Sequence, residues 1–413
     1  MGVSVGLVGL GQFGSAFVDL FRAHPLVDRV VLCDRESSRV KACLDHCGAD
    51  PKIDREACGV SLADFAASDI DAAALFTQPW LHAGQAVQLM EAGKHVYSAV
   101  PVVMLPDGDA ILDSCARLIA TCERTGQLYM LGETTYYRPE AMFCRRKSGE
   151  GAFGDIVYAE GEYMHDVDAE CCLRDVDKSR LESAAGREWE AERENYAQAG
   201  IRGGPMHYPT HSVSGPLSVM NAKPVKVTAY GWRNRNRDPF FRQDAFSNEI
   251  ALFQMNTGAT LRICEAREIA GAFHESETFR ILGTAGTFAE CTWKENFRRD
   301  ALTARPLEVT DLTIDDMRDP LPPEVALSFM RLHHPDASDP NAFVPAGHGG
   351  SHPYLVHEFL DAVTRSRLPA VNAWDAARYM SMGVTAHQSA LRNGETLAVP
   401  DFGDPDDNWT QGS

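Results

Sequence analysis

The sequence lacks three features, each of which would have pointed to a class of protein. It contains no Cys-x-x-Cys pair, and its 11 cysteines are odd in number and scattered through segments predicted to be strands and helices. This pattern argues against a disulfide framework or a zinc site and favours reduced thiols in the cytoplasm. No apolar run reaches the ~20 residues that cross a bilayer. No basic segment precedes the first apolar stretch, so we predict neither a membrane span nor a signal peptide.

Positive charge is also scarce. The chain carries 39 Lys and Arg residues against 58 Asp and Glu residues, which gives a formal net charge of −19. That balance argues against nucleic acid or an anionic membrane as a partner, although an anionic substrate would respond to the local field of its site. At 413 residues the chain is long enough for two domains that each bury a core.

What the sequence does contain is a glycine-rich turn near its start. An apolar run, Val3–Val8, leads into Gly9-Leu-Gly-Gln-Phe-Gly14, and apolar residues at helical spacing follow. In a strand–turn–helix unit the first glycine allows a tight turn, the second lets a pyrophosphate approach the backbone, and the third permits close packing. The N–H groups at the start of the helix would face the phosphates. We therefore predict a dinucleotide site at Gly9, Gly11, Gln12, Phe13 and Gly14.

The next strand supports this prediction and indicates which dinucleotide binds. The segment Arg29–Cys33 leads directly to Asp34, about twenty residues beyond the last glycine, where an acidic side chain meets the adenosine ribose. A carboxylate at this position favours NAD over NADP because it repels a 2′-phosphate. Arg35 keeps the alternative open, since an arginine there can bind such a phosphate; otherwise it is a solvated turn residue.

Hydrophobic periodicity predicts an α/β fold. Short apolar runs alternate with amphipathic helices up to about residue 135, which is typical of a doubly wound parallel sheet. Five later segments, which start at residues 156, 225, 249, 259 and 277, alternate as strands of an antiparallel sheet with one covered face do. We predict a Rossmann domain at 1–135, an α+β domain with an open, mostly antiparallel sheet at 136–372, and a C-terminal helix with an acidic tail at 373–413.

Two segments of the second domain are expected to lie outside its sheet. The charged, helix-prone segment 178–198 is predicted to be a surface excursion. The segment 311–339 is rich in proline and aspartate and is predicted to be an extended loop.

This organisation resembles the Gfo/Idh/MocA oxidoreductases over nearly the whole chain. Besides the glycine turn, the resemblance is carried by Thr77–His82, Glu91–Val96 and Gly154–Ile156. It implies a NAD-dependent enzyme that forms a homo-oligomer, either a dimer or a tetramer, through its second sheet. It also implies further cofactor contacts at the ends of two strands, namely Thr77, Gln78, Pro79, His82, Ala99, Val100 and Pro101.

One position departs from the family pattern. Typical members have Glu-Lys-Pro where this chain has Ala99-Val-Pro101, and that lysine helps to move the proton of the alcohol; Val100 has no titratable group. The segment Gly203–His211, with its Tyr-Pro-Thr-His end, resembles the NAD-dependent α-N-acetylgalactosaminidases, a glycosidase branch that also replaces the lysine with valine. The match extends to Gly161–Asp166 and to the region of Trp189.

By this resemblance His211 and Tyr208 face a sugar substrate. We predict that His211 is the base for the sugar hydroxyl, because histidine titrates near neutral pH. Tyr208 would share the proton or orient the sugar. The chemistry needs a second base, for which His165 and Tyr163 are the candidates. Ordinary packing or hydrogen bonding within the domain is the alternative for each of these four side chains.

Further substrate contacts are predicted at Tyr136, His207, Trp232, Arg233, Arg235, His348 and His352. The basic cluster Trp232–Arg237 is either an anion clamp for the substrate or a solvated loop. The glycine-rich segment Gly347–Tyr354 is either a wall of the substrate site or an ordinary turn before a helix. Pro209 lies between His207 and His211 and argues against a metal pair on one helix, so no metal is predicted.

These observations favour one function and leave two alternatives. We favour a NAD-dependent, carbohydrate-active enzyme that hydrolyses a glycoside without net redox change. In such a cycle C3 is oxidised, the C1 substituent leaves by elimination, water adds, and the ketone is reduced again. The first alternative is a net sugar or polyol dehydrogenase with His211 in place of the lysine. The second is a non-catalytic NAD-binding sensor.

Overall fold

A computed structural model describes residues 2–169, 173–235, 237–271, 277–296, 307–406 and 409. Cys171, Cys172 and most of the end of the acidic tail lie outside these ranges. The nine cysteines within them are free thiols.

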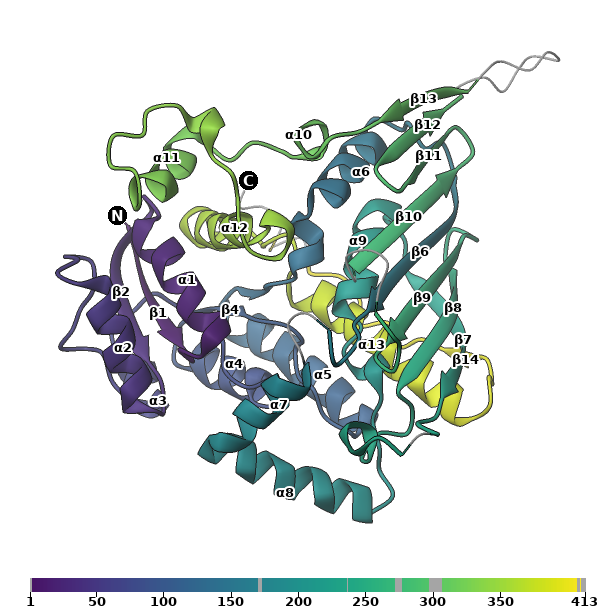
Figure 1. Ribbon diagram of the computed structural model, residues 1–413, viewed down its shortest axis with the longest axis horizontal. Coiled ribbons are helices and arrows are strands. Elements are labelled where there is room, and N and C mark those ends of the chain that lie inside the picture. Colours follow the sequence, from purple (N-terminus) through teal and green to yellow (C-terminus); the bar gives the residue numbers. More distant parts are fainter. Residues whose placement is uncertain are drawn as a thin grey trace.

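The N-terminal part is a parallel sheet covered on both faces by helices (Figure 1). Its strands are β1 (Val3–Val8), β2 (Val27–Cys33), β3 (Ala72–Leu75), β4 (His95–Ser98) and β5 (Tyr129–Leu131). They lie in the order β2-β1-β3-β4-β5 and all neighbours are parallel. The connecting helices are α1 (Gln12–Ala23), α2 (Ser37–Cys47), α3 (Leu62–Ala67), α4 (His82–Glu91) and α5 (Gly108–Thr125). The doubly wound pattern predicted from periodicity is confirmed.

The second sheet is larger and mixed. Its strands are β6 (Ile156–Met164), β7 (Pro224–Trp232), β8 (Asn248–Met255), β9 (Thr260–Ala266), β10 (Glu277–Gly283), β11 (Gly286–Ala289), β12 (Thr292–Glu295), β13 (Glu308–Asp311) and β14 (Leu397–Ala398). The order is β13-β12-β11-β10-β6-β9-β8-β7-β14, and in the described part of the chain β6 and β9 form the parallel pair among antiparallel neighbours. This arrangement confirms the predicted open, mostly antiparallel sheet.

Helices cover one face of this second sheet, and α9 carries a candidate site residue. They are α6 (Pro139–Gly149), α9 (Thr210–Met220) and α13 (Ala373–Leu391). In β8 the side chains of Ala251 and Phe253 are buried under these helices, while Ile250 and Leu252 are exposed on the other face. Helix α13 packs on α5 as well as on β7, so the C-terminal helix joins the two sheets (Figure 1).

Helix α12 (His352–Arg365) also connects the two parts of the molecule. Its apolar residues Leu355, Val356 and Phe359 are buried in the same core cluster as Phe17 of α1. The chain thus returns from the second sheet to complete the packing of the first. The remaining short helices are η1 (Thr134–Tyr137), η2 (Pro205–His207), η3 (Pro239–Phe241), η4 (Pro340–Ala342) and η5 (His348–Gly350).

Of the two segments expected outside the sheet, one has the expected character and the other does not. The helix-prone surface segment 178–198 lies in α7 (Leu173–Glu182) and α8 (Ala184–Gln198), in which Gly186 is the buried residue. Trp189 of α8 stacks on Trp80 of the first domain, with 4.8 Å between ring centroids. The segment predicted as an extended loop contains α10 (Ile314–Met317) and α11 (Pro323–Arg331). Its prolines occupy the start of α11, where proline is favoured, and Val325 and Phe329 are buried.

Candidate active site

The glycine turn has the geometry that a dinucleotide phosphate requires. Gly9 has φ +91° and a Cβ there would collide with the backbone of Phe76. A Cβ on Gly14 would overlap the carbonyl oxygen of Gly9, whereas a Cβ on Gly11 would lie in nearly open space. Helix α1 begins at Gln12 without a side-chain cap, so its first N–H groups are left for a ligand. The backbone therefore forms a cradle that fits a pyrophosphate.

Asp34 lies beside this cradle, and backbone N–H groups of neighbouring residues hold its side chain. Its side chain is buried and accepts hydrogen bonds from the N–H groups of Leu10 (2.6 Å) and Glu36 (2.8 Å). The guanidinium of Arg39 lies 3.6 Å from the same carboxylate, a contact that the sequence analysis missed. Arg35 instead turns away and makes a two-pronged ion pair with Glu188 of α8.

The two strand-end turns predicted to contact the cofactor are joined by one histidine. His82 is buried, and its ring nitrogens lie 2.9 Å from the carbonyl oxygen of Pro101 and 3.0 Å from that of Thr77. Burial lowers the pKa of His82, and the neutral ring has one N–H, which donates to one of the two carbonyls while the ring packs between both turns. The Thr77 hydroxyl donates to Gln85. Val100 is half-buried against the core.

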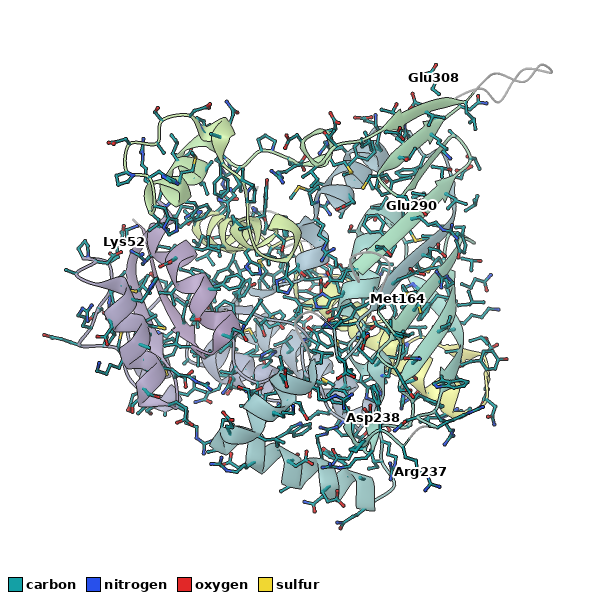
Figure 2. The ribbon with its side chains drawn as sticks, viewed as in Figure 1. Lys52, Met164, Arg237, Asp238, Glu290 and Glu308 are labelled. Atoms are coloured by element: carbon teal, nitrogen blue, oxygen red, sulfur yellow. The ribbon has the colours of Figure 1, made fainter. Side chains whose placement is uncertain are left out.

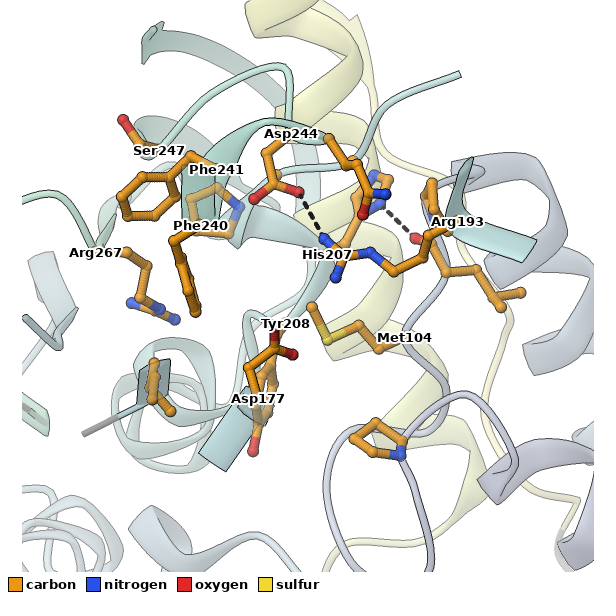
Figure 3. A pocket seen from close by; sticks show the side chains of 18 of the residues that line it. Met104, Asp177, Arg193, His207, Tyr208, Phe240, Phe241, Asp244, Ser247 and Arg267 are labelled. Carbon is orange, nitrogen blue, oxygen red and sulfur yellow. Dashed lines mark hydrogen bonds and ion pairs between the residues drawn. The ribbon is translucent and has the colours of Figure 1, made fainter. Parts of the chain in front are cut away.

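A cavity of about 180 Å³ is lined by residues of both domains, including residues of α7 and α8. Figure 3 shows several of its side chains. Its wall is mostly apolar, with several aromatic rings and a few charged side chains, a composition typical of ligand pockets. The lining includes Pro79, Trp80, Met104, Tyr163, Asp177, Arg180, Trp189, Arg193, His207, Tyr208, Phe240, Phe241, Asp244, Phe246 and Arg267. The sequence-predicted residues Tyr163, His207, Tyr208 and Pro79 therefore meet at one cavity.

A chain of three polar side chains reaches this cavity from the core. The carboxylate of Glu133 lies 2.8 Å from Nδ1 of His211, and Nε2 of His211 lies 3.1 Å from the hydroxyl of Tyr208. Glu133 follows β5 of the first sheet, whereas His211 is in the first turn of α9. Glu133 and His211 are buried, and Tyr208 is the member that lines the cavity. The arrangement can pass a proton between the cavity and the buried imidazole.

The charges around Glu133, His211 and Tyr208 favour a protonated, positively charged His211 at neutral pH. Burial alone would lower the pKa of His211, but the carboxylates of Glu133 and Glu277 raise it to about 9. Burial alone would raise the pKa of Glu133, but the charge of His211 and hydrogen bonds to the carboxylate lower it to about 2. Burial raises the pKa of Tyr208 well above its usual value. The pair is therefore an imidazolium and a carboxylate, and His211 must lose a proton before it can act as a base.

Tyr163 and His165 lie on the other side of Tyr208. The Tyr163 hydroxyl is 2.9 Å from Nδ1 of His165, and its ring packs edge-on against His211 with 4.9 Å between centroids. Arg267 covers the Tyr163 ring at 4.1 Å and pairs with Glu265 at 2.7 Å. Tyr163 thus reaches the cavity together with Tyr208, and His165 lies behind it at the end of β6.

His207 supports the loop that leads into α9. It is buried, its Nδ1 lies 2.8 Å from the carbonyl oxygen of Leu105, and burial lowers its pKa to about 3. The loop that carries it is held by Glu249, which accepts from the N–H of Met206 at 3.0 Å and pairs with His387 at 2.8 Å. These contacts fix the segment that leads into α9 and place Tyr208 and His211. Among the described residues there is no group of three side chains that could hold a metal ion.

The other predicted substrate residues lie away from this cavity. Tyr136 packs against Tyr137, with the guanidinium of Arg145 3.9 Å above its ring. Arg233 lines a neighbouring hollow, and Arg235 lies 4.4 Å over the exposed ring of Trp232. Figure 2 shows Arg237 at the periphery of the molecule. This placement of Arg235 and Arg237 matches the solvated-loop alternative.

The glycine-rich loop before α12 approaches the cofactor cradle instead. His348 and His352 are joined by a contact of 2.9 Å between ring nitrogens, and their rings lie 5.5 and 5.4 Å from the ring of Phe13. The loop therefore covers the glycine turn. His348 also lies near enough to His211 for the imidazolium charge, together with burial, to lower its pKa.

Comparison with known proteins agrees with the geometry. Residues 3–133 match the model of the oxidoreductase family with the NAD-binding Rossmann fold, GFO_IDH_MocA. This match spans the predicted Rossmann domain. A Streptomyces niveus protein named glycosyl hydrolase family 109 protein is 26% identical over 97% of this chain and 77% of its own length. A Bacteroides fragilis alpha-N-acetylgalactosaminidase is 24% identical over 97% of this chain and 92% of its own. The resemblance inferred from the sequence motifs is confirmed.

Solved structures extend the fold assignment to the second domain. A levoglucosan dehydrogenase in complex with NADH superposes with a TM-score of 0.71 at 17% identity, covering 97% of this chain and all of that one. An oxidoreductase domain protein from Kribbella flavida gives 0.70 at 16% identity, with coverage of 97% and 100%. Both sheets of the chain therefore share the fold of these oxidoreductases. No helix in the described ranges is long and apolar enough to cross a membrane.

Proposed function

We propose that this protein is a NAD-dependent glycoside hydrolase that oxidises and re-reduces its substrate in each turnover. The observation that carries the proposal is the chain Glu133–His211–Tyr208, which ends at a cavity between the two domains. It supplies a proton route where Val100 cannot. The names of the family 109 relatives support the same reaction class.

The residues around the glycine turn fit NAD. The cradle at Gly9, Gly11 and Gly14 would hold the pyrophosphate, and Asp34 would meet the adenosine ribose. The turns at Thr77 and Pro101, joined through His82, would border the nicotinamide ribose. When bound, NAD supplies the acceptor and later the donor of a hydride.

The side chains of this protein manage the protons. Tyr208 faces the C3 hydroxyl of the sugar and, in molecules whose His211 has lost its proton, passes the hydroxyl proton to the neutral imidazole as the hydride leaves. Glu133 holds the imidazole in position and stabilises the charge that it gains. Once C3 is a ketone, the C2 proton is acidic, and a second base removes it as the C1 oxygen departs with a proton taken from solvent water. Tyr163 is our candidate for that base because it reaches the same cavity. Burial raises the pKa of Tyr163 and keeps its phenol neutral, so it takes the C2 proton as its own proton passes to Nδ1 of His165.

Water and the same groups complete the cycle. Water adds at C1, the proton returns to C2, and a hydride and a proton return to C3. The net change is hydrolysis of one glycosidic bond with no net oxidation. The aromatic side chains of the cavity wall, including the Trp80–Trp189 stack, limit access of bulk water to the ketone intermediate of the substrate.

The free thiols of the described cysteines support a cytoplasmic location.

Turnover in deuterated water tests the proposal. The NAD-loaded protein is given a panel of nitrophenyl glycosides, and we follow nitrophenol, NADH and the isotope content of the released sugar. Nitrophenol release without NADH accumulation, with deuterium at C2, supports the mechanism. Hydrolysis without C2 exchange would exclude it. NADH release without bond cleavage would make the protein a dehydrogenase, and tight NAD binding with neither reaction would make it a sensor.

A further inference from the structure

One cationic side chain in the cavity has no partner in the described part of the chain. Arg180, on α7, lines the cavity beside Tyr208, and among the described residues its guanidinium makes no hydrogen bond or ion pair. It is partly buried, and burial lowers its pKa from the usual arginine value. A guanidinium stays charged in proteins, so a positive charge faces this largely apolar cavity.

Each of the other charged side chains of the cavity has an oppositely charged neighbour. Arg267 pairs with Glu265 at 2.7 Å. Arg193 lies 3.9 Å from Asp244, whose pKa burial raises to about 6. Asp177 is one turn from Arg180 on α7, and the attraction of its carboxylate stabilises the charge of Arg180 without an ion pair between them. Among the described residues, Arg180 is thus the cation of the cavity that has neither a hydrogen bond nor an ion pair.

The backbone of Arg180 is held in place. Its carbonyl oxygen accepts from the N–H of Ser183 at 3.0 Å and from the Ser183 hydroxyl at 2.7 Å. Gly186 packs against that carbonyl so closely that a Cβ would overlap it. The junction of α7 and α8 therefore fixes the backbone from which the arginine side chain extends. An unpaired guanidinium in a partly buried, largely apolar cavity suits a carboxylate or another planar anion.

We propose that the substrate carries an anionic group, such as a uronic acid carboxylate, which Arg180 binds. The inference rests on the proposed function only in that the ligand is a sugar. It moves anion recognition from the exposed cluster at Arg233 and Arg235 to the cavity that contains Tyr208. The dinucleotide pyrophosphate is a second source of the same chemistry. We favour the substrate because Arg180 lines the cavity with Tyr163 and Tyr208, whereas the glycine turn does not line it.

Matched sugars test this assignment without turnover. Methyl α-galacturonide and methyl α-galactoside differ only in a carboxylate at C6, and the gluco pair does the same. Binding of each to the NAD-loaded protein is measured by calorimetry and by tryptophan fluorescence, since Trp80 and Trp189 line the cavity. We expect the acid of at least one pair to bind about tenfold to a hundredfold more tightly than its neutral twin, as a charged hydrogen bond gives.

Substitutions of Arg180 test whether this residue causes the preference for the acidic sugar. Arg180→Met should abolish the preference and leave binding of the neutral sugar and of NAD within about twofold, whereas Arg180→Lys should keep part of it. Arg235→Met is the matched control, because this exposed arginine should have no effect. If Arg180→Met lowers the melting temperature strongly, Arg180→Gln takes its place.

Three results would overturn the inference. They are an equal affinity for both members of every pair, a preference that survives loss of Arg180, and a tenfold loss of NAD affinity in Arg180→Met, which would assign the arginine to the pyrophosphate. An acid preference without hydrolysis would instead leave this inference standing and remove the glycosidase proposal.

Discussion

Glu133 and His211 form a buried ion pair across the boundary between the two sheets, with 2.8 Å between Oε1 and Nδ1. Glu133 is at the carboxyl end of the last strand of the parallel sheet, where ligands bind in folds of this type. His211 is at the start of a helix that covers the second sheet. The proton-handling group therefore forms only when both sheets are assembled.

The first prediction concerns this pair. Because the pKa of His211 is raised to about 9, the imidazole is protonated at neutral pH and becomes a base only as pH rises. Activity should increase with pH on a limb that ends near this value. Glu133→Gln removes the main charge that raises the pKa while burial, which lowers it, remains. The limb should move to lower pH, and kcat should fall by about 10²-fold or more through lost orientation.

A pH profile of kcat/KM for both proteins checks this. His211→Ala should be inactive at every pH and still bind NAD, because the cofactor contacts lie on other elements. An unshifted limb in Glu133→Gln would mean that another group controls the profile.

The second prediction concerns cofactor choice. Asp34 is buried and fixed by two backbone N–H groups, so its carboxylate should repel the 2′-phosphate of NADP. Calorimetry should give a lower Kd for NAD than for NADP, and Asp34→Ser should narrow the difference. Arg35→Ala is the comparison variant and should change neither value much, because Arg35 is paired with Glu188. A wild-type preference for NADP would contradict the prediction and would direct attention to Arg39, 3.6 Å from Asp34.

The third prediction concerns the valine at the usual lysine position. Val100 is half-buried against the core, and a lysine there would add a desolvated charge. Val100→Lys should therefore not raise kcat on the natural substrate, whereas Val100→Ala should stay near the wild-type rate. Steady-state assays of both variants decide the matter. A several-fold gain with lysine would indicate that the chain has lost a proton donor that it still needs.

The fourth prediction concerns assembly. Tyr230, Ile250 and Leu252 are 64%, 47% and 50% exposed on the face of the second sheet that its helices do not cover. Adjacent exposed apolar residues on an open sheet are typical of an interface. Light scattering at micromolar concentration should show a dimer or tetramer, and Ile250→Lys with Leu252→Lys should yield monomers. A monomeric wild-type protein would show that this face has another use.

Local sequence patterns predicted most of the fold. Alternation predicted β6 to β10, and the glycine turn predicted the cradle, because both depend on residues close together in sequence. Glu133 was missed because its partner is 78 residues away and nothing local marks it; its position just after a strand of the parallel sheet was the available signal. Arg180 was missed because a charged helix has the composition of a solvated surface. Contacts distant in sequence, such as the stacking of Trp189 of α8 on Trp80, place the helical pair over the cavity.

The last prediction concerns the helical pair α7–α8. Its contacts with the first domain include a stacked tryptophan pair and an ion pair. The rings of Trp80 and Trp189 are stacked at an interplanar angle of 8° and shield the cavity. An aromatic pair contributes ~0.5–1.5 kcal/mol beyond the area that it buries. The ion pair of Arg35 with Glu188 is largely exposed and should contribute little. Trp189→Ala should therefore raise KM about tenfold and allow water to reach the ketone stage, so that NADH accumulates during turnover. Glu188→Gln should leave both quantities nearly unchanged. KM values and NADH absorbance for the two variants separate the contacts, and equal effects would mean that the ion pair holds the helices as strongly as the tryptophan stack does.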